Sequence, residues 1–478
     1  MSVATSDPTT LVGGTWGDPD ERREVANPVD GSVVGSVGYG GAAEARAAAD
    51  AAGAAFAEWA DTPARGRADV LLRAGALLAE RADAIAELLA REAGKRLPEA
   101  AGEVGLSAEY LRWFAEEARR PAGQLHPHEQ PGRRHLSIRR PAGVVASLTP
   151  WNFPVSIQAR KLAPALAAGC TVVARPSEKA PLAAVELVRC LQDAGLPDGV
   201  LNLVHGPAAE VTDALLAHPA VRVVSFTGST GVGRRVMAAA SERVVRPLLE
   251  LGGDAPFIVF EDADLDAAVE GALVAKLRNS GQSCIGANRF LVHEHVHDVF
   301  VERLAERVDG MTVGDGLADP LPDLGPLIDA DRVASVTSMV DEAMAAGARR
   351  VTRDFDLPAE GSYAAPALLV DVPDDARLAR EEIFGPAAGV FPFSDEDEAL
   401  ARANGTEMGL AAYLYTRDVD RVWRVGEHLE TGIVGVNTGL PTVVFAPMGG
   451  IKQSGLGREG SSLGLEDFEE VRYLAFGI

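Results

Sequence analysis

After Gly143 the chain alternates short apolar runs with helical stretches, and this alternation constrains the fold more than any other feature. The apolar runs are expected strands at 144–148, 171–174, 201–204 and 221–226, with helices expected at 162–168 and 180–194. Strands that alternate with helices form a parallel sheet covered on both faces. The sequence therefore predicts an α/β fold with a doubly wound sheet.

A second α/β unit is expected to begin near Gly252. It opens with the apolar run 256–260, and a helix with Asp264 as its N-cap follows, ending at Arg278. The pattern predicts two α/β units in one chain.

Two other segments have a different character. Residues 42–118 are rich in Ala, Glu, Arg and Leu with apolar residues at helical spacing, which predicts several amphipathic helices. Residues 121–141 are rich in Pro, Gly, His and Arg, and 134–140 alternate like an exposed strand. Residues 471–476 resemble a matching terminal strand. We expect these strands to form an arm that joins a neighbouring subunit.

The acidic composition limits the partners. A net charge of −24 and a pI near 4.8 argue against nucleic acid and anionic membranes, because long-range repulsion opposes both. An anionic substrate would need local cations. The three cysteines lack metal or redox spacing, residues 1–8 lack a secretory signal pattern, and no apolar run reaches the length of a membrane span. We therefore expect a cytoplasmic protein.

Cys284 is the candidate nucleophile. It lies in the loop 279–286 among small residues and amides, just after a helical stretch, where a thiol is accessible to backbone donors. Cys190, in an apolar helical stretch, is expected to be structural. The loop by itself is equally compatible with an inert thiol, so other residues must decide.

Three further segments suggest chemistry, although each has a plain structural alternative. The glycine-rich turn 226–233 links a strand to a helix, where free N–H groups could bind a phosphate, but it lacks the Gly-x-Gly-x-x-Gly fingerprint. Glu250 ends an apolar run before two glycines, where poor solvation would raise its pKa toward that of a general base. Asn152 follows a strand between two prolines and could donate to an oxyanion.

Taken together, these motifs resemble the aldehyde dehydrogenase superfamily from about Val12 to the C-terminus. The motifs that carry the resemblance, in the order that the superfamily has them, are Pro-Trp-Asn at 150–152, Phe-Thr-Gly-Ser-Thr at 226–230, Glu-Leu-Gly-Gly at 250–253, Gly-Gln-x-Cys at 281–284 and Glu-Glu-Ile-Phe-Gly-Pro at 381–386. The resemblance implies a Rossmann-like NAD(P)-binding domain over 1–122 and 143–252, a catalytic domain over 253–445, and a small β oligomerisation arm at 123–142 and 460–478, as in homodimers and homotetramers.

The resemblance also implies a catalytic role for four residues. Cys284 would attack the aldehyde carbon while Asn152 and the Cys284 N–H bind the oxyanion, and Glu250 would activate the water that hydrolyses the thioester. Lys161 matches a lysine near the active site that would help protons leave. A coenzyme A acyl-transferring variant is disfavoured because Glu250 is present.

The implied cofactor is NAD, with NADP as the alternative. The resemblance assigns cofactor contacts to Trp151, Arg175, Ser177, Glu178, Gly206, Gly228, Ser229, Glu382 and Phe384. Glu178 can accept hydrogen bonds from both ribose hydroxyls and would repel a 2′-phosphate, which favours NAD. Arg175, which replaces the usual lysine, and Ser177 favour NADP weakly.

Within the superfamily the chain is most similar to succinate-semialdehyde dehydrogenases. Arg160 and Arg278 match two arginines that bind the distal carboxylate there, and Thr442 falls where that subfamily has a serine. Guanidinium groups suit a carboxylate, so a substrate with a distal carboxylate is expected. A broader ω-semialdehyde or general aliphatic or aromatic aldehyde dehydrogenase remains the alternative. Gly286 replaces a cysteine that forms a disulfide with the nucleophile in some members, so no such switch is expected.

Readings from other classes have less support. A cysteine hydrolase would need a histidine beside Cys284, and nothing in the sequence provides one. His293, His295 and His297 alternate as on one strand face and invite a metal-site reading, but we expect no metal because a strand gives way to a helix there. A binding protein without catalysis is disfavoured by the joint presence of Cys284, Glu250 and Asn152.

Overall fold

The computed structural model describes residues 7–120 and 123–478, and the parallel sheet expected after Gly143 is at the centre of its first unit. The sheet order is β19-β11-β10-β7-β8-β9-β1-β2, in which β11 to β9 are mutually parallel and β1 and β19 add antiparallel edges. Its strands are β1 (Leu11–Val12), β2 (Thr15–Trp16), β7 (Val144–Leu148), β8 (Thr171–Arg175), β9 (Leu201–Leu203), β10 (Val221–Thr227), β11 (Arg246–Glu250) and β19 (Gly455–Leu456). The doubly wound sheet predicted from the alternation is confirmed.

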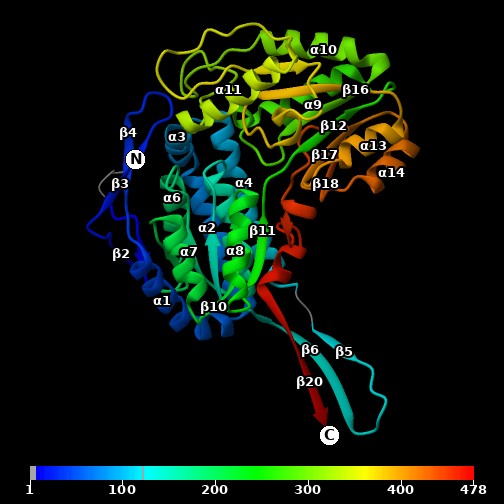
Figure 1. Ribbon diagram of the computed structural model, residues 1–478. Helices are drawn as coiled ribbons and strands as arrows, with labels where there is room; N and C mark the ends of the chain where they lie inside the picture. The colour runs from blue at the N-terminus through cyan, green and yellow to red at the C-terminus, as the bar shows by residue number, and fades with distance from the viewer. Residues whose placement is uncertain (1–6, 121–122) are drawn as a thin grey trace.

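Eight helices among the described residues cover the two faces of this sheet (Figure 1). One core cluster joins it to α2 (Ala64–Glu80), α3 (Ala82–Ala93), α4 (Leu97–Glu117), α5 (Pro154–Ala168) and α6 (Leu182–Asp193). The opposite cluster contains α1 (Ala42–Asp61), α7 (Ala208–Ala217) and α8 (Thr230–Ser241). Because alternate residues of each strand enter opposite clusters, the strands have few polar positions and appear in the sequence as continuous apolar runs.

The second unit is a seven-stranded sheet in the order β14-β15-β16-β13-β12-β17-β18. Its strands are β12 (Ala255–Val259), β13 (Ala287–His293), β14 (Arg349–Arg350), β15 (Ala367–Val370), β16 (Ala387–Phe393), β17 (Ala411–Tyr415) and β18 (Ile433–Val436). Helices α9 (Leu265–Leu277) and α10 (Glu294–Asp309) cover one face, and α11 (Ala330–Ala345), α12 (Arg377–Arg380), α13 (Glu396–Asn404) and α14 (Val419–His428) cover the other. Asp264 caps α9 as predicted, because its side chain accepts from the N–H of Ala267.

An arm of three antiparallel strands extends away from both units (Figure 1). It contains β5 (Gln124–His126), β6 (Arg133–Pro141) and β20 (Glu469–Gly477), with Leu474 opposite Leu136. The matching of the two strands is therefore confirmed, but the expected arm boundary at residue 460 is too early. The short helix η3 (Leu463–Phe468) buries Leu465 and Phe468 in the first unit's core.

Smaller elements complete the chain. A hairpin of β3 (Arg22–Ala26) and β4 (Val33–Gly38) lies at the edge of the first unit, and η1 (Arg278–Gly281) and η2 (Lys452–Ser454) are single turns. Residues 1–6 and 121–122 lie outside the described residues. The expectation of no secretory signal and the expected domain boundary at residue 122 both fall there. Within the described part of the chain, no helix is both long and apolar enough to cross a membrane.

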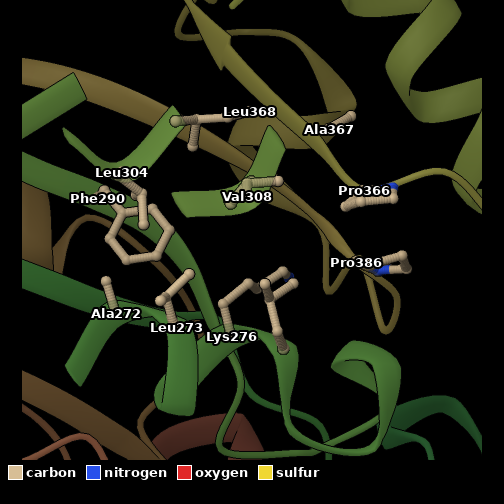
Figure 2. Close-up of a pocket in the computed structure, with 12 residues that line it drawn as sticks. Ala272, Leu273, Lys276, Phe290, Leu304, Val308, Pro366, Ala367, Leu368 and Pro386 are labelled. Carbon is tan, nitrogen blue, oxygen red and sulfur yellow. The ribbon is translucent and has the colours of Figure 1, made fainter. Parts of the chain in front are cut away.

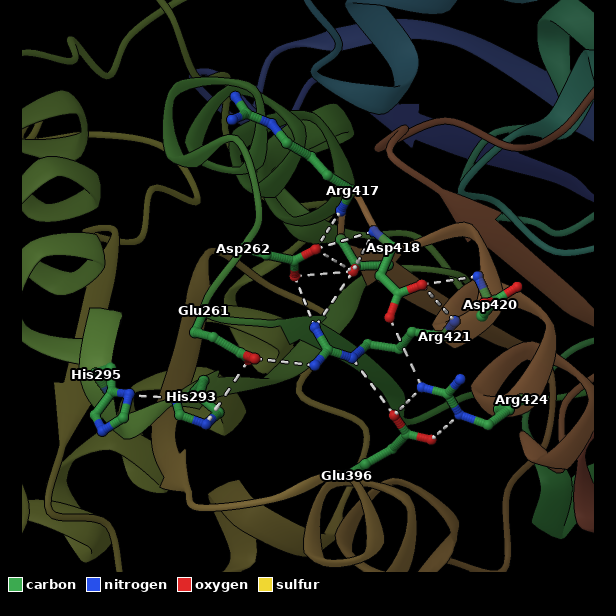
Figure 3. Close-up of polar contacts among 11 residues, drawn as sticks. Glu261, Asp262, His293, His295, Glu396, Arg417, Asp418, Asp420, Arg421 and Arg424 are labelled. Atoms are coloured by element: carbon green, nitrogen blue, oxygen red, sulfur yellow. Dashed lines mark hydrogen bonds and ion pairs between the residues drawn. The ribbon is translucent and has the colours of Figure 1, made fainter.

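Arg421 ties α13 and α14 to the end of β12 in the second unit (Figure 3). Its guanidinium lies 2.9 Å from Glu261, 2.7 Å from Asp262 and 3.4 Å from Glu396, and 4.2 Å from the centre of the Phe260 ring. One cation among three carboxylates from two segments fixes how those segments meet.

Candidate active site

The loops that carry the sequence motifs meet between the two units. Asn152 follows β7 and Glu250 ends β11, whereas Cys284 lies between η1 and β13 of the second unit. Asn152 Nδ2 donates to the Gln282 carbonyl at 3.2 Å. A Cβ built on Gly253 would lie 2.2 Å from the Cys284 carbonyl oxygen, so only glycine allows this approach. The structure thus brings the three residues from separate units to one place.

The Cys284 loop has an unusual backbone. Asn279, Ser280 and Gly281 all have positive φ, at 53°, 54° and 78°. Such conformations persist only where surrounding contacts fix them. Gln282 provides two of those contacts, because its side chain donates to the Asn279 carbonyl at 3.2 Å and accepts from the Ile328 N–H at 2.9 Å. The backbone that carries the Cys284 sulfur is therefore held in one conformation.

Cys284 is partly open to a cavity but is otherwise enclosed. Burial raises the pKa of its thiol to about 12, an effect that the nearby Arg160 charge opposes. In this state the sulfur carries its proton, so it needs a base to become a nucleophile. Among the residues that the structure describes, the Cys284 N–H donates to no other group.

Asn152 is buried beside the loop that carries Cys284. One hydrogen of its Nδ2 goes to the Gln282 carbonyl, and an amide nitrogen carries two, so one stays free. Asn279 Nδ2 donates to the Asn152 carbonyl at 3.0 Å, which holds the two loops together. A free amide hydrogen and a free backbone N–H at one site can receive an oxyanion.

Glu250 is 2% exposed, and neither carboxyl oxygen has a hydrogen-bond partner among the described residues. Burial raises the pKa of this carboxyl to about 8, and the nearby Glu459 carboxylate raises it further, whereas Arg160 and Lys161 oppose the shift. A pKa near neutrality suits a general base. Both oxygens keep their capacity to accept hydrogen bonds.

The cavity in front of Cys284 has a volume of about 340 Å³. Arg160, Arg278, Thr442 and Tyr110 line it together with Cys284. The Arg278 guanidinium lies over the Phe153 ring at 4.9 Å and forms no ion pair with a carboxylate among the described residues. The cavity therefore holds a thiol, two guanidinium groups and hydroxyls, together with the carboxyl groups of Glu99 and Glu103.

Arg160 and Lys161 are buried and share one carboxylate. Glu459 lies with Oε2 2.6 Å from Arg160 Nε and with Oε1 2.5 Å from Lys161 Nζ, and Lys161 also donates to Ser225 Oγ at 3.0 Å. Burial alone would raise the pKa of Glu459, but the two cations outweigh it, so the pKa is lowered. The carboxylate is therefore ionised.

Most of the predicted cofactor residues lie where strands of the first sheet end, in the segments that follow β7, β8, β9 and β10. Ser229 is the N-cap of α8 and makes no side-chain cap bond, so the first N–H groups of the helix face outward. Trp151 and Phe384 meet edge to face at 5.5 Å. A Cβ on Gly228 would clash with the Phe226 ring at 2.5 Å, so the turn needs glycine there.

Glu382 and the segment after β8 carry the remaining predicted cofactor contacts. The Glu382 carboxyl accepts from the Gly253 N–H at 3.1 Å, and burial raises its pKa to about 7. Arg175 donates to Glu178 at 2.5 Å and to the Gly206 carbonyl at 2.8 Å. This pairing lowers the pKa of Glu178 against the effect of burial, so its charge is present but shared.

Ser177 lies in the same turn as Glu178. Its hydroxyl accepts from the Lys179 N–H at 3.3 Å. The hydroxyl therefore shapes the turn and keeps a hydrogen to donate.

A second cavity, under α9, is too small to be a substrate site (Figure 2). Its volume is about 20 Å³, enough for about one water molecule. Lys276 reaches into it among apolar side chains and donates to Asn288 Oδ1 at 3.0 Å, and burial lowers its pKa to about 7.

The histidine cluster lies where a strand gives way to a helix, as expected. β13 ends at His293, so His295 and His297 lie on α10 and not on one strand face. His293 Nδ1 accepts from the His295 N–H at 3.3 Å and caps the helix. Throughout residues 7–120 and 123–478, no group of three His, Cys, Asp or Glu side chains could hold a metal ion.

Sequence reasoning missed four residues near the site. Glu459 and Tyr110 were not singled out by any motif. Lys95 and Glu103 form a buried ion pair, and Glu103 lines the cavity and also accepts from the N–H groups of Val155 and Ser156. For Glu103 the only signal available was the rarity of a buried Glu in a helical pattern.

Comparison with known proteins identifies the family. The model of the "Aldehyde dehydrogenase family" matches residues 16–474. A glutarate-semialdehyde dehydrogenase of Pseudomonas aeruginosa is 47% identical over 98% of this chain and 97% of its own, and an NADP(+) succinate-semialdehyde dehydrogenase of Escherichia coli is 47% identical over the same shares. The crystal structure of succinate-semialdehyde dehydrogenase from Burkholderia pseudomallei has a TM-score of 0.97 at 45% identity, covering 100% of this chain and 99% of that one. The chain belongs to the aldehyde dehydrogenase family.

Proposed function

We propose that this protein oxidises an aldehyde with a distal carboxylate, first of all succinate semialdehyde, to the carboxylic acid with NAD(P). The observation that carries the proposal is the cavity in which Cys284 lies with Arg160, Arg278 and Thr442. Two guanidinium groups and a hydroxyl match a carboxylate in charge and geometry. The names of the two relatives, succinate- and glutarate-semialdehyde dehydrogenase, support this substrate class.

We infer that the residues at these strand ends bind a dinucleotide. The uncapped N-terminus of α8 at Ser229 suits a pyrophosphate, and Glu382 would bind the nicotinamide ribose. Trp151 and Phe384 would bound the nicotinamide, and Gly206, Gly228, Arg175, Ser177 and Glu178 the rest of the cofactor. A bound nicotinamide would supply the hydride acceptor for the adduct on Cys284.

The first half of the reaction uses Cys284 and Asn152. Burial keeps the thiol protonated in the free protein, so its proton passes to water in the open cavity as the sulfur bonds to the carbonyl carbon. The carbonyl electron pair moves to oxygen, where the free Asn152 hydrogen and the Cys284 N–H stabilise it. Loss of a hydride then leaves an acyl group on the sulfur as a thioester.

The second half hydrolyses the thioester. Glu250 accepts a proton from water while the water oxygen bonds to the acyl carbon. The carbon–sulfur bond breaks, the sulfur regains a proton, and the carboxylic acid leaves. Lys161, which is paired with Glu459 and acts electrostatically on Glu250, would help the released protons leave.

We propose NAD as the preferred cofactor, with NADP also accepted. The Glu178 carboxylate can accept from ribose hydroxyls and would repel a 2′-phosphate. Its pairing with Arg175 weakens that repulsion, and the E. coli relative is named for NADP(+). The ratio of catalytic efficiencies with the two cofactors tests this preference.

We propose that the arm makes a homodimer or homotetramer. β20 is an edge strand with exposed Val471, Tyr473 and Phe476, and a free edge can pair with another chain. Light scattering on purified protein tests the oligomeric state. We also propose a cytoplasmic location, because the three cysteines are free thiols, as in reducing compartments.

A substrate panel tests the central proposal. NADH formation is followed with succinate semialdehyde, glutarate semialdehyde, butanal and benzaldehyde at equal concentrations. The proposal predicts the highest kcat/KM for a carboxylated aldehyde. Equal efficiency with butanal would favour the broader aldehyde dehydrogenase, which the 340 Å³ cavity could also accommodate.

A further inference from the structure

Two neighbouring cations on α5 converge on one acid from the far end of the chain. Arg160 and Lys161 are consecutive, so their side chains leave the helix about 100° apart. Each nevertheless reaches a different oxygen of Glu459, at 2.6 Å and 2.5 Å. All three side chains are buried, and 298 residues separate Lys161 from Glu459. The carboxylate therefore spans the gap between the two side chains.

The backbone fixes where this carboxylate lies. The Glu459 N–H donates to the Met448 carbonyl at 2.7 Å, and the Met448 N–H donates back to Glu459 at 2.8 Å. Met448 also lines the cavity with Cys284. Gly460 follows with φ of 68°, and a Cβ there would meet the Tyr110 ring at 3.9 Å. Glu459 is thus attached to the rigid wall of the pocket.

Glu459 itself does not line the cavity, whereas Arg160 does. It cannot touch the substrate and acts only through its partners. The Arg160 guanidinium is buried at the end of a flexible side chain of three methylene groups. Without a counter-ion it would be an uncompensated buried charge. Its orientation toward the pocket depends on the ion pair.

We propose that Glu459 is a positioning residue for substrate recognition, holding the Arg160 guanidinium at the cavity wall so that it and Arg278 receive the distal carboxylate of the aldehyde together. This inference rests on the proposed function and extends it to a residue outside the pocket. It implies that loss of Glu459 impairs carboxylated aldehydes more than uncharged ones.

The test compares Glu459→Gln and Glu459→Asp with the wild-type protein. Glutamine keeps the shape without the charge, and aspartate keeps the charge but is too short to reach both cations. Exposed Glu466 provides the matched control, Glu466→Gln. For each protein, kcat/KM is measured with succinate semialdehyde and with butanal, and kcat is measured against pH.

Two results are expected from Glu459→Gln. The ratio of kcat/KM for succinate semialdehyde to that for butanal falls about tenfold, the scale of one charged hydrogen bond. The acid midpoint of kcat moves to lower pH, because the Glu459 charge raises the pKa of Glu250. The charged or titratable groups facing Glu250 are Cys284, Arg160, Lys161, Arg458 and Glu459. Asp467 also lies within electrostatic range of Glu459.

Glu459→Asp should lower the selectivity ratio without moving the midpoint, and it decides the question if the glutamine variant does not fold. Equal losses with both aldehydes would overturn the inference, as would a selectivity ratio like that of Glu466→Gln. A wild-type protein that oxidises no aldehyde would instead refute the proposed function, so the two failures are distinguishable.

Discussion

Arg278 should contribute more to recognition of the substrate carboxylate than Arg160. Arg160 shares its charge with Glu459, whereas Arg278 has no carboxylate partner among the described residues and lies half-buried over the Phe153 ring. A substrate anion would therefore be the main counter-ion of Arg278. We expect Arg278→Met, which keeps most of the side-chain volume, to remove a charged hydrogen bond worth about 1.5–3 kcal/mol.

That energy corresponds to a loss of about 10- to 150-fold in kcat/KM for succinate semialdehyde at 25 °C. Butanal, which has no distal charge, should lose less than about threefold under the same reasoning. NADH formation under initial-rate conditions gives both values. The loss for Arg160→Met, measured beside it, should be smaller than that for Arg278→Met.

Equal losses for the two aldehydes would refute the reasoning, because they would show that Arg278 supports the pocket and not the anion. A larger loss for Arg160→Met would also contradict it, since it would mean that the ion pair with Glu459 leaves the Arg160 charge fully available.

Further predictions concern the base, the cofactor and the buried charges. Glu250→Gln should form about one NADH per site in a rapid burst and then turn over slowly, which stopped-flow absorbance detects. The wild-type kcat should fall as pH drops below about 8, because protonated Glu250 cannot accept a proton from water, and a pH profile measures this. Glu178→Gln should raise the efficiency ratio of NADP to NAD about tenfold, the scale of one charged contact. Lys95→Met should lower the free energy of unfolding by about 3 kcal/mol, because it leaves Glu103 buried without its cation, and urea denaturation tests it.

A specific result would contradict each of these four predictions. Steady turnover without a burst would remove Glu250 from the hydrolytic step, and a flat pH profile would show that its protonation does not limit the rate. An unchanged ratio of NADP to NAD efficiency in Glu178→Gln would mean that the 2′-phosphate of NADP lies away from Glu178. A Lys95→Met protein as stable as the wild type would mean that Glu103 takes up a proton or is solvated.

Much of the fold could be predicted because its signals are local. The strand and helix alternation after Gly143, the Asp264 cap and the pairing of 134–140 with 471–476 each follow from short-range patterns. The change from strand to helix at the histidine segment was also predictable, and it separates His295 and His297 from the strand face.

The candidate site was predictable only where a motif marks it. The segments with Asn152, Glu250 and Cys284 could be recognised from their residues, but no local pattern links Glu459 to Lys161 across 298 residues. Tyr110 likewise looks like an ordinary apolar position of α4 until the fold places it at the cavity. Contacts of this kind depend on the packing of distant segments, which a single sequence does not encode locally.

The most direct test of the account is to identify the acyl group on the enzyme. Protein mixed with NAD and succinate semialdehyde is quenched in acid within a turnover, digested, and analysed by mass spectrometry. The account predicts one succinyl group on Cys284, accumulating further in Glu250→Gln. NADH formation without any acyl group on that peptide, or with the group on another residue, would contradict it.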